Sequence, residues 1–227
     1  MPHFPPNILI VELEPLSINT LLNLLNILIK QGVLELYVTT SPSVVDVIVG
    51  ERTYSIAITP FTLIITHSET ILPEKSEFKV YKTSRDAWID CVKLRTKQLL
   101  GLLTALINNN YRALVEHNIV VENKINCEDI LLCFPLTVKS TMYSTRKEYS
   151  MTRAYTLYKE MLREQKILIA VCVVNSNVLP YAWIEKREGS DVLVLKRCEK
   201  PGEEKITVKI ILDYLVTQSS ISRSIDI

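Results

Sequence analysis

The chain has 227 residues, a hydrophobic fraction of 48% and a formal net charge of +1, from 26 basic and 25 acidic side chains. This length suits one large domain or two small ones, and the apolar content excludes an intrinsically disordered chain. The near-zero net charge excludes an overall attraction to nucleic acid or to anionic membranes, so any such binding requires a local patch.

The cysteines and histidines exclude several kinds of site. The five cysteines are odd in number and include no C-x-x-C pair, which argues against both a disulfide framework and a zinc site. We therefore expect buried free thiols in a reducing cytoplasm. His3, His67 and His117 lie in three separate segments without metal-ligand spacing. Glycine-rich phosphate-binding motifs and a G-x-S-x-G elbow are also missing, so we expect no metal and no other cofactor.

The first part of the chain predicts one helix and a small antiparallel sheet. A strand over 7–14 precedes Ser17, a favourable N-cap residue, and a helix that runs to Lys30 and stops at Gly32. Its apolar stretch is too short to span a bilayer, so we interpret it as a buried helix and expect no membrane association. β-branched runs predict a meander at 33–39, 44–49, 53–59 and 61–66, and a further strand at 78–81.

A long helix is expected next, from Ser84 to Ile107, with Asp86 in its first turn. The asparagine triplet that follows predicts a domain boundary near Asn110. We therefore expect an N-terminal α+β domain at 1–110 and a second αβ domain at 111–227.

The second part predicts a mixed α/β arrangement, so that the whole chain belongs to the α+β class. Its sharpest feature is a change of period: apolar side chains at helical spacing from Ser150 give way to an unbroken apolar run from Ile167 to Val174. This pattern predicts a helix followed by a buried strand. The other predicted elements are a helix at 111–117, strands at 118–122 and 129–134, a polar loop to Tyr149, and strands at 178–184, 192–195 and 206–212.

The predicted helix of this second part carries basic residues. Lys159, Arg163 and Lys166 are spaced at i, i+4 and i+7, on the face opposite the apolar residues, and Arg146, Lys147 and Arg153 lie nearby. Such a stripe can contact RNA phosphates, and it is equally the pattern of a solvated helix face.

Two further groups have both a structural and a functional interpretation. Tyr181 and Trp183 alternate along one strand and, with Ile184, form either core packing or a protein interface. Glu128 and Asp129 begin one strand and Lys166 begins another, an arrangement found in metal-dependent nucleases, although charged residues at element ends are commonly only solvated.

Two segments carry a resemblance to a known family. The chain reads YRALVEHNIVVENKINCEDILLCF from Tyr111, and LREQKILIAVCVVNSNVLPYAWIE after the polar loop. These segments resemble the C-terminal, nuclease-like domain of archaeal tRNA-splicing endonucleases, which implies a restriction-endonuclease-like αβ fold for 111–227. The matching positions are Tyr111, Arg112, Leu114, Val120, Val121, Asp129 and Lys166 to Val171.

The catalytic residues of that family are mostly missing. A tyrosine, a histidine and a lysine act in the family, which cuts introns from precursor tRNA without a metal. Here the tyrosine position falls on Cys133 or Phe134, no histidine follows His117, and Lys166 alone matches the lysine. The resemblance therefore implies a non-catalytic, structural subunit that assembles with a catalytic endonuclease subunit, as a hetero-oligomer that handles precursor tRNA. A binding or assembly module of another archaeal or viral nucleic-acid complex remains the alternative.

Overall fold

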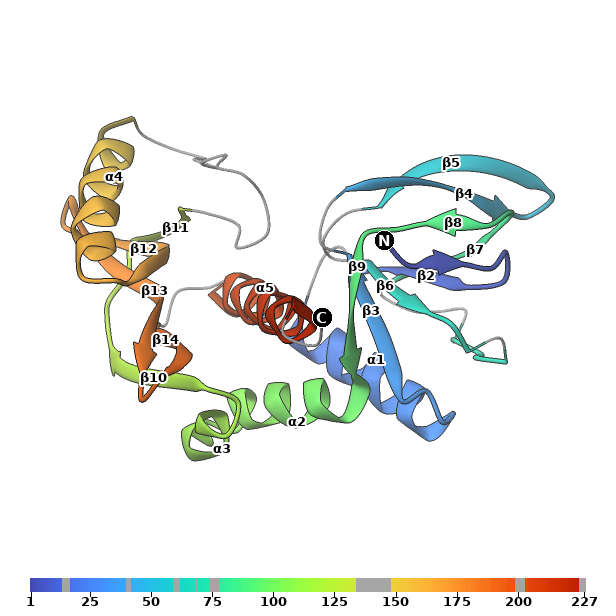
Figure 1. Ribbon diagram of the computed structural model, residues 1–227, viewed down its shortest axis with the longest axis horizontal. Coiled ribbons are helices and arrows are strands. Elements are labelled where there is room, and N and C mark those ends of the chain that lie inside the picture. Colours follow the sequence, from blue (N-terminus) through green and yellow to red (C-terminus); the bar gives the residue numbers. More distant parts are fainter. Residues whose placement is uncertain are drawn as a thin grey trace. The chain divides into compact units, whose positions relative to one another are not determined.

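The computed structural model describes residues 1–13, 17–39, 42–58, 62–67, 69–73, 78–133, 148–198 and 203–224. Helices and mostly antiparallel sheets form a mixed α+β fold, as predicted (Figure 1). The chain divides into two compact units, Met1–Thr104 with Leu215–Ile227, and Ala105–Tyr214. The division lies a few residues before the predicted boundary at Asn110. The end of the chain is grouped with the first unit, whereas we expected it in the second.

The first unit is built on a seven-stranded antiparallel sheet. Its strands are β2 (Leu9–Glu12), β3 (Glu35–Thr39), β4 (Ser43–Val49), β5 (Arg52–Ile58), β6 (Thr62–Ile65), β7 (Lys79–Thr83) and β9 (Cys91–Arg95). Their order in space is β5-β4-β7-β2-β6-β3-β9, so only β4 and β5 are neighbours in both sequence and space. The predicted meander is therefore wrong. A separate two-stranded sheet pairs β1 (His3–Phe4) with β8 (Ala87–Trp88).

β2 occupies the centre of this sheet because its residues are apolar on both faces. Ile8 and Ile10 pack into a hydrophobic cluster with residues of β4, among them Val47. Leu9 and Val11 point to the opposite face and are also buried, since successive side chains of a strand alternate. Such a strand can only lie between two neighbours, here β7 and β6.

The predicted first helix is present as α1 (Ile18–Lys30). The Ser17 hydroxyl accepts a hydrogen bond from the Thr20 backbone N–H at 3.1 Å and so caps the helix, as expected. Gly32 follows the helix with φ of 79°, a conformation that favours glycine. The helix contributes a row of buried leucines to the core, Leu21, Leu24, Leu25 and Leu28. None of the described helices meets the combined length and hydropathy that crossing a membrane requires.

The long helix expected from Ser84 is wrong in its first half. Residues 87–95 contain β8 and β9, and α2 (Thr96–Ile107) begins only at Thr96. The apolar spacing of this segment fits a helix, but β9 pairs with β3, and this pairing sets Leu94 opposite Leu36. Cross-strand packing of this kind overrides a local helical pattern.

The second unit contains a five-stranded mixed sheet in the order β10-β14-β13-β12-β11. The strands are β10 (Ile119–Lys124), β11 (Asp129–Leu132), β12 (Ile167–Val174), β13 (Asn177–Arg187) and β14 (Ser190–Arg197), and only β10 and β14 are parallel. Among the described residues, α3 (Tyr111–Val115) and α4 (Glu148–Arg163) lie wholly within this unit. The predicted helix-to-strand change is confirmed by α4 and β12. The predicted polar loop before Tyr149 lies mostly outside the described residues.

The strand expected at 206–212 is a helix, α5 (Glu203–Ser224). Its β-branched residues suggested a strand, and a short apolar run cannot be assigned to strand or helix from its period alone. Thr207, Val208, Ile210, Ile211, Leu212 and Tyr214 are all buried, which is the pattern of a helix enclosed by protein. The Tyr214 hydroxyl donates to the Asp191 carbonyl at 2.8 Å and so fixes the helix to the β13–β14 hairpin.

The cysteines do not remain entirely free. A disulfide joins Cys127, just before β11, to Cys172 in β12, with the Cα atoms 5.4 Å apart. β11 and β12 are paired antiparallel, and this long-range pairing brings the two cysteines together. The prediction of free thiols is therefore wrong for this pair, whereas Cys91, Cys133 and Cys198 are buried thiols outside any disulfide, as expected.

Candidate functional site

The face of the second sheet that α4 covers is the centre of the candidate site. Ala154 and Met161 of α4 are buried in a hydrophobic cluster that includes Leu168 of β12 and Trp183 of β13. The helix is amphipathic, with Tyr155 about half exposed on its outer surface. The packing of the apolar face therefore determines which charged residues of the helix face solvent.

The predicted RNA-binding residues are only partly brought together. Arg153, Lys159 and Arg163 are exposed on α4. Lys166 lies beyond the last helical residue, so the three-residue helical stripe is reduced to two residues, with Lys166 in the connection to β12. Arg146 and Lys147 lie outside the described residues.

Two of the basic side chains on α4, Arg153 and Lys159, have partners that the structure defines. Arg153 donates from Nη1 to the Ser176 carbonyl at 2.5 Å, which ties α4 to the β12–β13 turn. The Lys159 Nζ lies 4.4 Å from the centroid of the Tyr155 ring, a cation–π arrangement. Because both members of this pair are exposed, they offer a cation and an aromatic face to solvent at the same point of the helix.

Lys166 is part of an ion pair. Its Nζ lies 2.8 Å from Oε2 of Glu164, and this hydrogen bond is the main reason why the pKa of Lys166 is raised. The charges of Glu185 and Glu122 act in the same direction. The ammonium is therefore protonated at neutral pH and is already balanced by a carboxylate.

A network of charged residues, which sequence reasoning did not find, surrounds Glu185 on β13. The Trp183 Nε1–H donates to Glu185 Oε2 at 2.8 Å, and the Arg187 Nε–H donates to Oε1 at 2.5 Å. Arg187 also reaches Glu122 of β10, with the charged atoms 3.8 Å apart. The strand period of two places residues 183, 185 and 187 on one face, and this alternation was the available signal.

The pKa of Glu185 reflects two opposing effects. Burial of the carboxylate, which is 15% exposed, would raise its pKa. The hydrogen bonds from Trp183 and Arg187 and the positive charges of Arg187 and Lys166 outweigh that effect, so the pKa is lowered below 4.5. The network is therefore ionised and internally satisfied at neutral pH, which is suited to holding strands together.

The residues predicted as an interface lie inside the unit instead. Tyr181, Trp183 and Ile184 are 0%, 7% and 6% exposed. β13 is also paired on both sides, with β12 and β14, so it has no free edge. We therefore do not propose these residues as contacts to a partner.

Tyr181 and Trp183 also do not share a face of the strand. Trp183 packs in the cluster under α4, whereas the Tyr181 hydroxyl bonds Glu203 at 2.6 Å and Thr207 at 3.0 Å, both in α5. The register of the β12–β13 pairing shifts near Ala170, opposite these residues, and such a bulge changes the alternation of side chains.

The acidic and basic residues of a metal-dependent nuclease are not assembled. Asp129 pairs with Val173 near the end of β12, whereas Lys166 precedes the first residue of that strand. Seven residues of extended chain separate the two ends by roughly 23 Å. Within the ranges that the structure describes, no three metal-ligating side chains form a cluster. The interpretation as a metal-dependent nuclease is therefore not pursued.

The resemblance puts the family's tyrosine position at Cys133 or Phe134, and of these two Phe134 lies outside the described residues. Cys133 follows β11 and is 2% exposed, and burial raises the pKa of its thiol to about 12. At neutral pH the thiol is protonated, so it cannot accept a proton from a ribose hydroxyl.

No protein-family model, characterised protein or solved structure matches the chain.

Proposed function

We propose that the chain is a structural, non-catalytic subunit that supports tRNA intron splicing by a cytoplasmic endonuclease complex. It assembles with a catalytic subunit that supplies the missing histidine, and the outer face of α4 contacts precursor tRNA. The proposal combines the resemblance of residues 111–185 with the state of the residues at the positions that matter for catalysis.

The environment of Cys133 is the observation that carries the non-catalytic role. A general base in this position needs access to the substrate and a pKa near the working pH. The thiol of Cys133 is enclosed by the cluster beneath α4, and its pKa of about 12 keeps it protonated. Lys166, the one residue that matches the family's catalytic set, is held by Glu164. These residues therefore fit a subunit that supports a catalytic partner better than they fit a subunit that cleaves RNA.

The RNA contact is supported by the exposed residues of α4. Lys159 and Arg163 lie one turn apart on the outer face, and Tyr155 precedes Lys159 by one turn. A cation beside an exposed aromatic ring can contact a phosphate and a base of single-stranded RNA together. Glu160 on the same helix and Glu164 just after it reduce the local positive charge, so the contact assists binding in a complex and does not by itself give strong affinity.

The direct test is assembly and cleavage with a partner. The tagged chain should co-purify with a histidine-bearing endonuclease subunit, and the mixture should cleave an intron-containing precursor tRNA faster than the partner alone. The chain alone should show no cleavage, with or without magnesium. A chain that remains monomeric beside such a subunit and does not change its cleavage rate would rule out the proposal.

The RNA contact has a separate test. In the assembled complex, Lys159→Ala with Arg163→Ala should weaken precursor tRNA binding and reduce the slope of log affinity against log salt by about one to two. Lys30→Ala, which removes a cation from the end of α1, is the matched control and should leave both quantities unchanged. Equal effects of the two changes would show that α4 does not contact the RNA.

A second candidate is a nucleic-acid-binding or assembly module of another complex. The exposed Lys159 and Tyr155 favour it, because their side chains are available without any partner subunit. Affinity of the isolated chain for RNA or DNA, unchanged by an endonuclease subunit, would support this candidate over the splicing role.

A further inference from the structure

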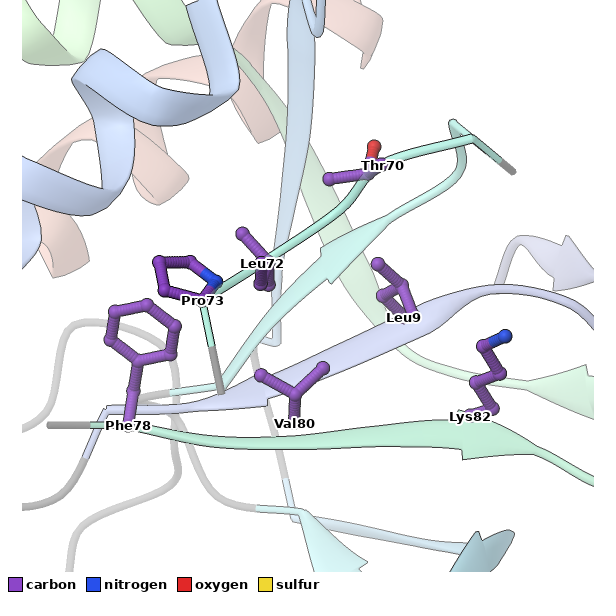
Figure 2. Close-up of a pocket in the computed structure, with 7 residues that line it drawn as sticks. All are labelled: Leu9, Thr70, Leu72, Pro73, Phe78, Val80 and Lys82. Atoms are coloured by element: carbon purple, nitrogen blue, oxygen red, sulfur yellow. The ribbon is translucent and has the colours of Figure 1, made fainter. Parts of the chain in front are cut away.

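A pocket in the first unit is lined by residues to which no function has been assigned above. It is about 360 Å³ in volume and lies between the segment 69–73 and the strands β2 and β7. Figure 2 shows Leu72 of that segment above Leu9 and Val80 of the sheet, with Phe78 at one end and Lys82 at the other. The side chains that line the pocket are therefore mostly apolar, with the hydroxyl-bearing Thr70 among them and one cation at one end.

The floor of the pocket follows from strand register. β2 and β7 are antiparallel, and their pairing sets Leu9 opposite Lys82 and Val11 opposite Val80. Directly opposed residues point to the same face, so the side chains of Leu9, Val80 and Lys82 are neighbours on one side of the sheet. This arrangement places the lysine beside apolar side chains of both strands.

The opposite wall is held in place by a side chain of α1's C-terminal cap. The Gln31 Oε1 accepts from the Ile71 backbone N–H at 2.7 Å, and its Nε2 donates to the Ile71 carbonyl. A side-chain amide that satisfies both backbone groups of one residue fixes the segment as a strand partner would. Leu72 is consequently held over the sheet, and the cavity beneath it is retained.

The two lysines on β7 differ in their ion pairing. Lys79 lies 3.7 Å from Glu12 and forms an ion pair. Lys82 is exposed and makes no ion pair with any residue in the described part of the chain. An unpaired ammonium at the end of an apolar pocket is complementary to a ligand with an aliphatic body and one negative head group.

The geometry points to a binding site for a small aliphatic carboxylate, whose chain packs between Leu72 and Val80 and whose head group pairs with Lys82. The volume holds roughly twelve groups of the size of a water molecule, which matches a carboxylate of about ten carbons. The site belongs to the first unit alone and is independent of the proposed role in splicing.

Calorimetric titration of the full chain with decanoate tests this site. Decanoate should bind with a one-to-one stoichiometry at concentrations below about 1 mM. Lys82→Met should weaken binding by about tenfold, the loss of one charge-assisted contact, and leave the fold unchanged because the side chain is exposed. Lys79→Met is the matched control on the same strand and should leave the affinity unchanged.

A second pair of measurements separates the head group from the apolar wall. Decyltrimethylammonium has a similar chain and the opposite charge, so it should bind at least about tenfold more weakly than decanoate. Leu72→Trp fills the cavity from a partly exposed position and should abolish decanoate binding while the circular dichroism spectrum stays native. No decanoate binding at about 1 mM, equal binding of the two amphiphiles, or equal effects of the Lys82 and Lys79 changes would overturn the proposal.

Discussion

Removal of the Cys127–Cys172 disulfide should destabilise the second unit, and Cys127→Ser is the change of choice because Cys127 is only partly buried. The bond closes a loop with a sequence separation of 45 residues. In the chain-entropy model, opening a loop of this length lowers the free energy of unfolding by about 4 kcal/mol. A loss between about 2 and 4 kcal/mol is therefore expected, since measured effects are commonly smaller than the model gives.

The assay can report on the second unit alone. Trp183 lies in the core beneath α4, and Trp88 belongs to the first unit, so urea unfolding followed by tryptophan fluorescence in a Trp88→Phe background monitors Trp183. Reductant should lower the midpoint of the otherwise wild-type chain and leave that of Cys127→Ser unchanged. Titration of the unfolded, unreduced protein with a thiol reagent should detect three free thiols. Five free thiols, or equal midpoints with and without reductant, would refute this reasoning.

Three further changes test individual contacts. Tyr214→Phe removes the hydroxyl that donates to the Asp191 carbonyl and should lower the free energy of unfolding by about 1–2 kcal/mol, with an unchanged midpoint counting against this bond. Glu185→Gln should cost about 1–2 kcal/mol at pH 7. Because the native pKa of Glu185 is lowered below 4.5, the difference in the free energy of unfolding between wild type and Glu185→Gln should be complete above pH 4.5 and vanish as the pH falls through the native pKa. A difference that does not depend on pH would exclude the ionised carboxylate as its source. Ser17→Ala removes the N-cap of α1 and should cost about 1 kcal/mol in thermal or urea unfolding, and Ser17→Asp should restore it.

Local patterns predicted the elements that depend on local interactions. β12 was predicted from Ile167 to Val174 and lies at these residues, because the end of α4 and the start of the strand coincide with a change of hydrophobic period. The N-cap at Ser17 was predicted for a similar reason, since the bond that satisfies it spans only three residues. Both features follow from neighbours in the sequence.

The failures concern contacts between distant residues. The apolar spacing of β9 predicts a helix, because the pairing of β9 with β3 is not visible in the sequence of β9 alone. The sheet order β5-β4-β7-β2-β6-β3-β9 likewise depends on which strands are apolar on both faces, and this becomes evident only when β2 is seen to be buried on each side. The disulfide could not be predicted, because an odd number of cysteines does not indicate which two of them meet when β11 pairs with β12.

The candidate site was predicted in part. The exposure of Lys159 and Arg163 follows from helical period, but the end of α4 at Arg163 removes Lys166 from the helix and pairs it with Glu164. The interior position of Tyr181 and Trp183 depends on a register shift in the sheet, which no strand pattern reveals. A disulfide is unusual in a cytoplasmic protein outside hyperthermophiles, so the redox state of Cys127 in the cell also tests the proposed location.

The position of Lys166 gives this residue a structural role that is independent of any catalysis. It joins α4 to β12, bonds Glu164, and adds positive charge near Glu185, whose carboxylate is bound by Trp183 and Arg187. Removal of this lysine would leave the carboxylates of the network less well balanced. This structural role of Lys166 does not depend on whether RNA is cleaved. The match of Lys166 to the lysine of the resembled family therefore does not by itself indicate a shared reaction.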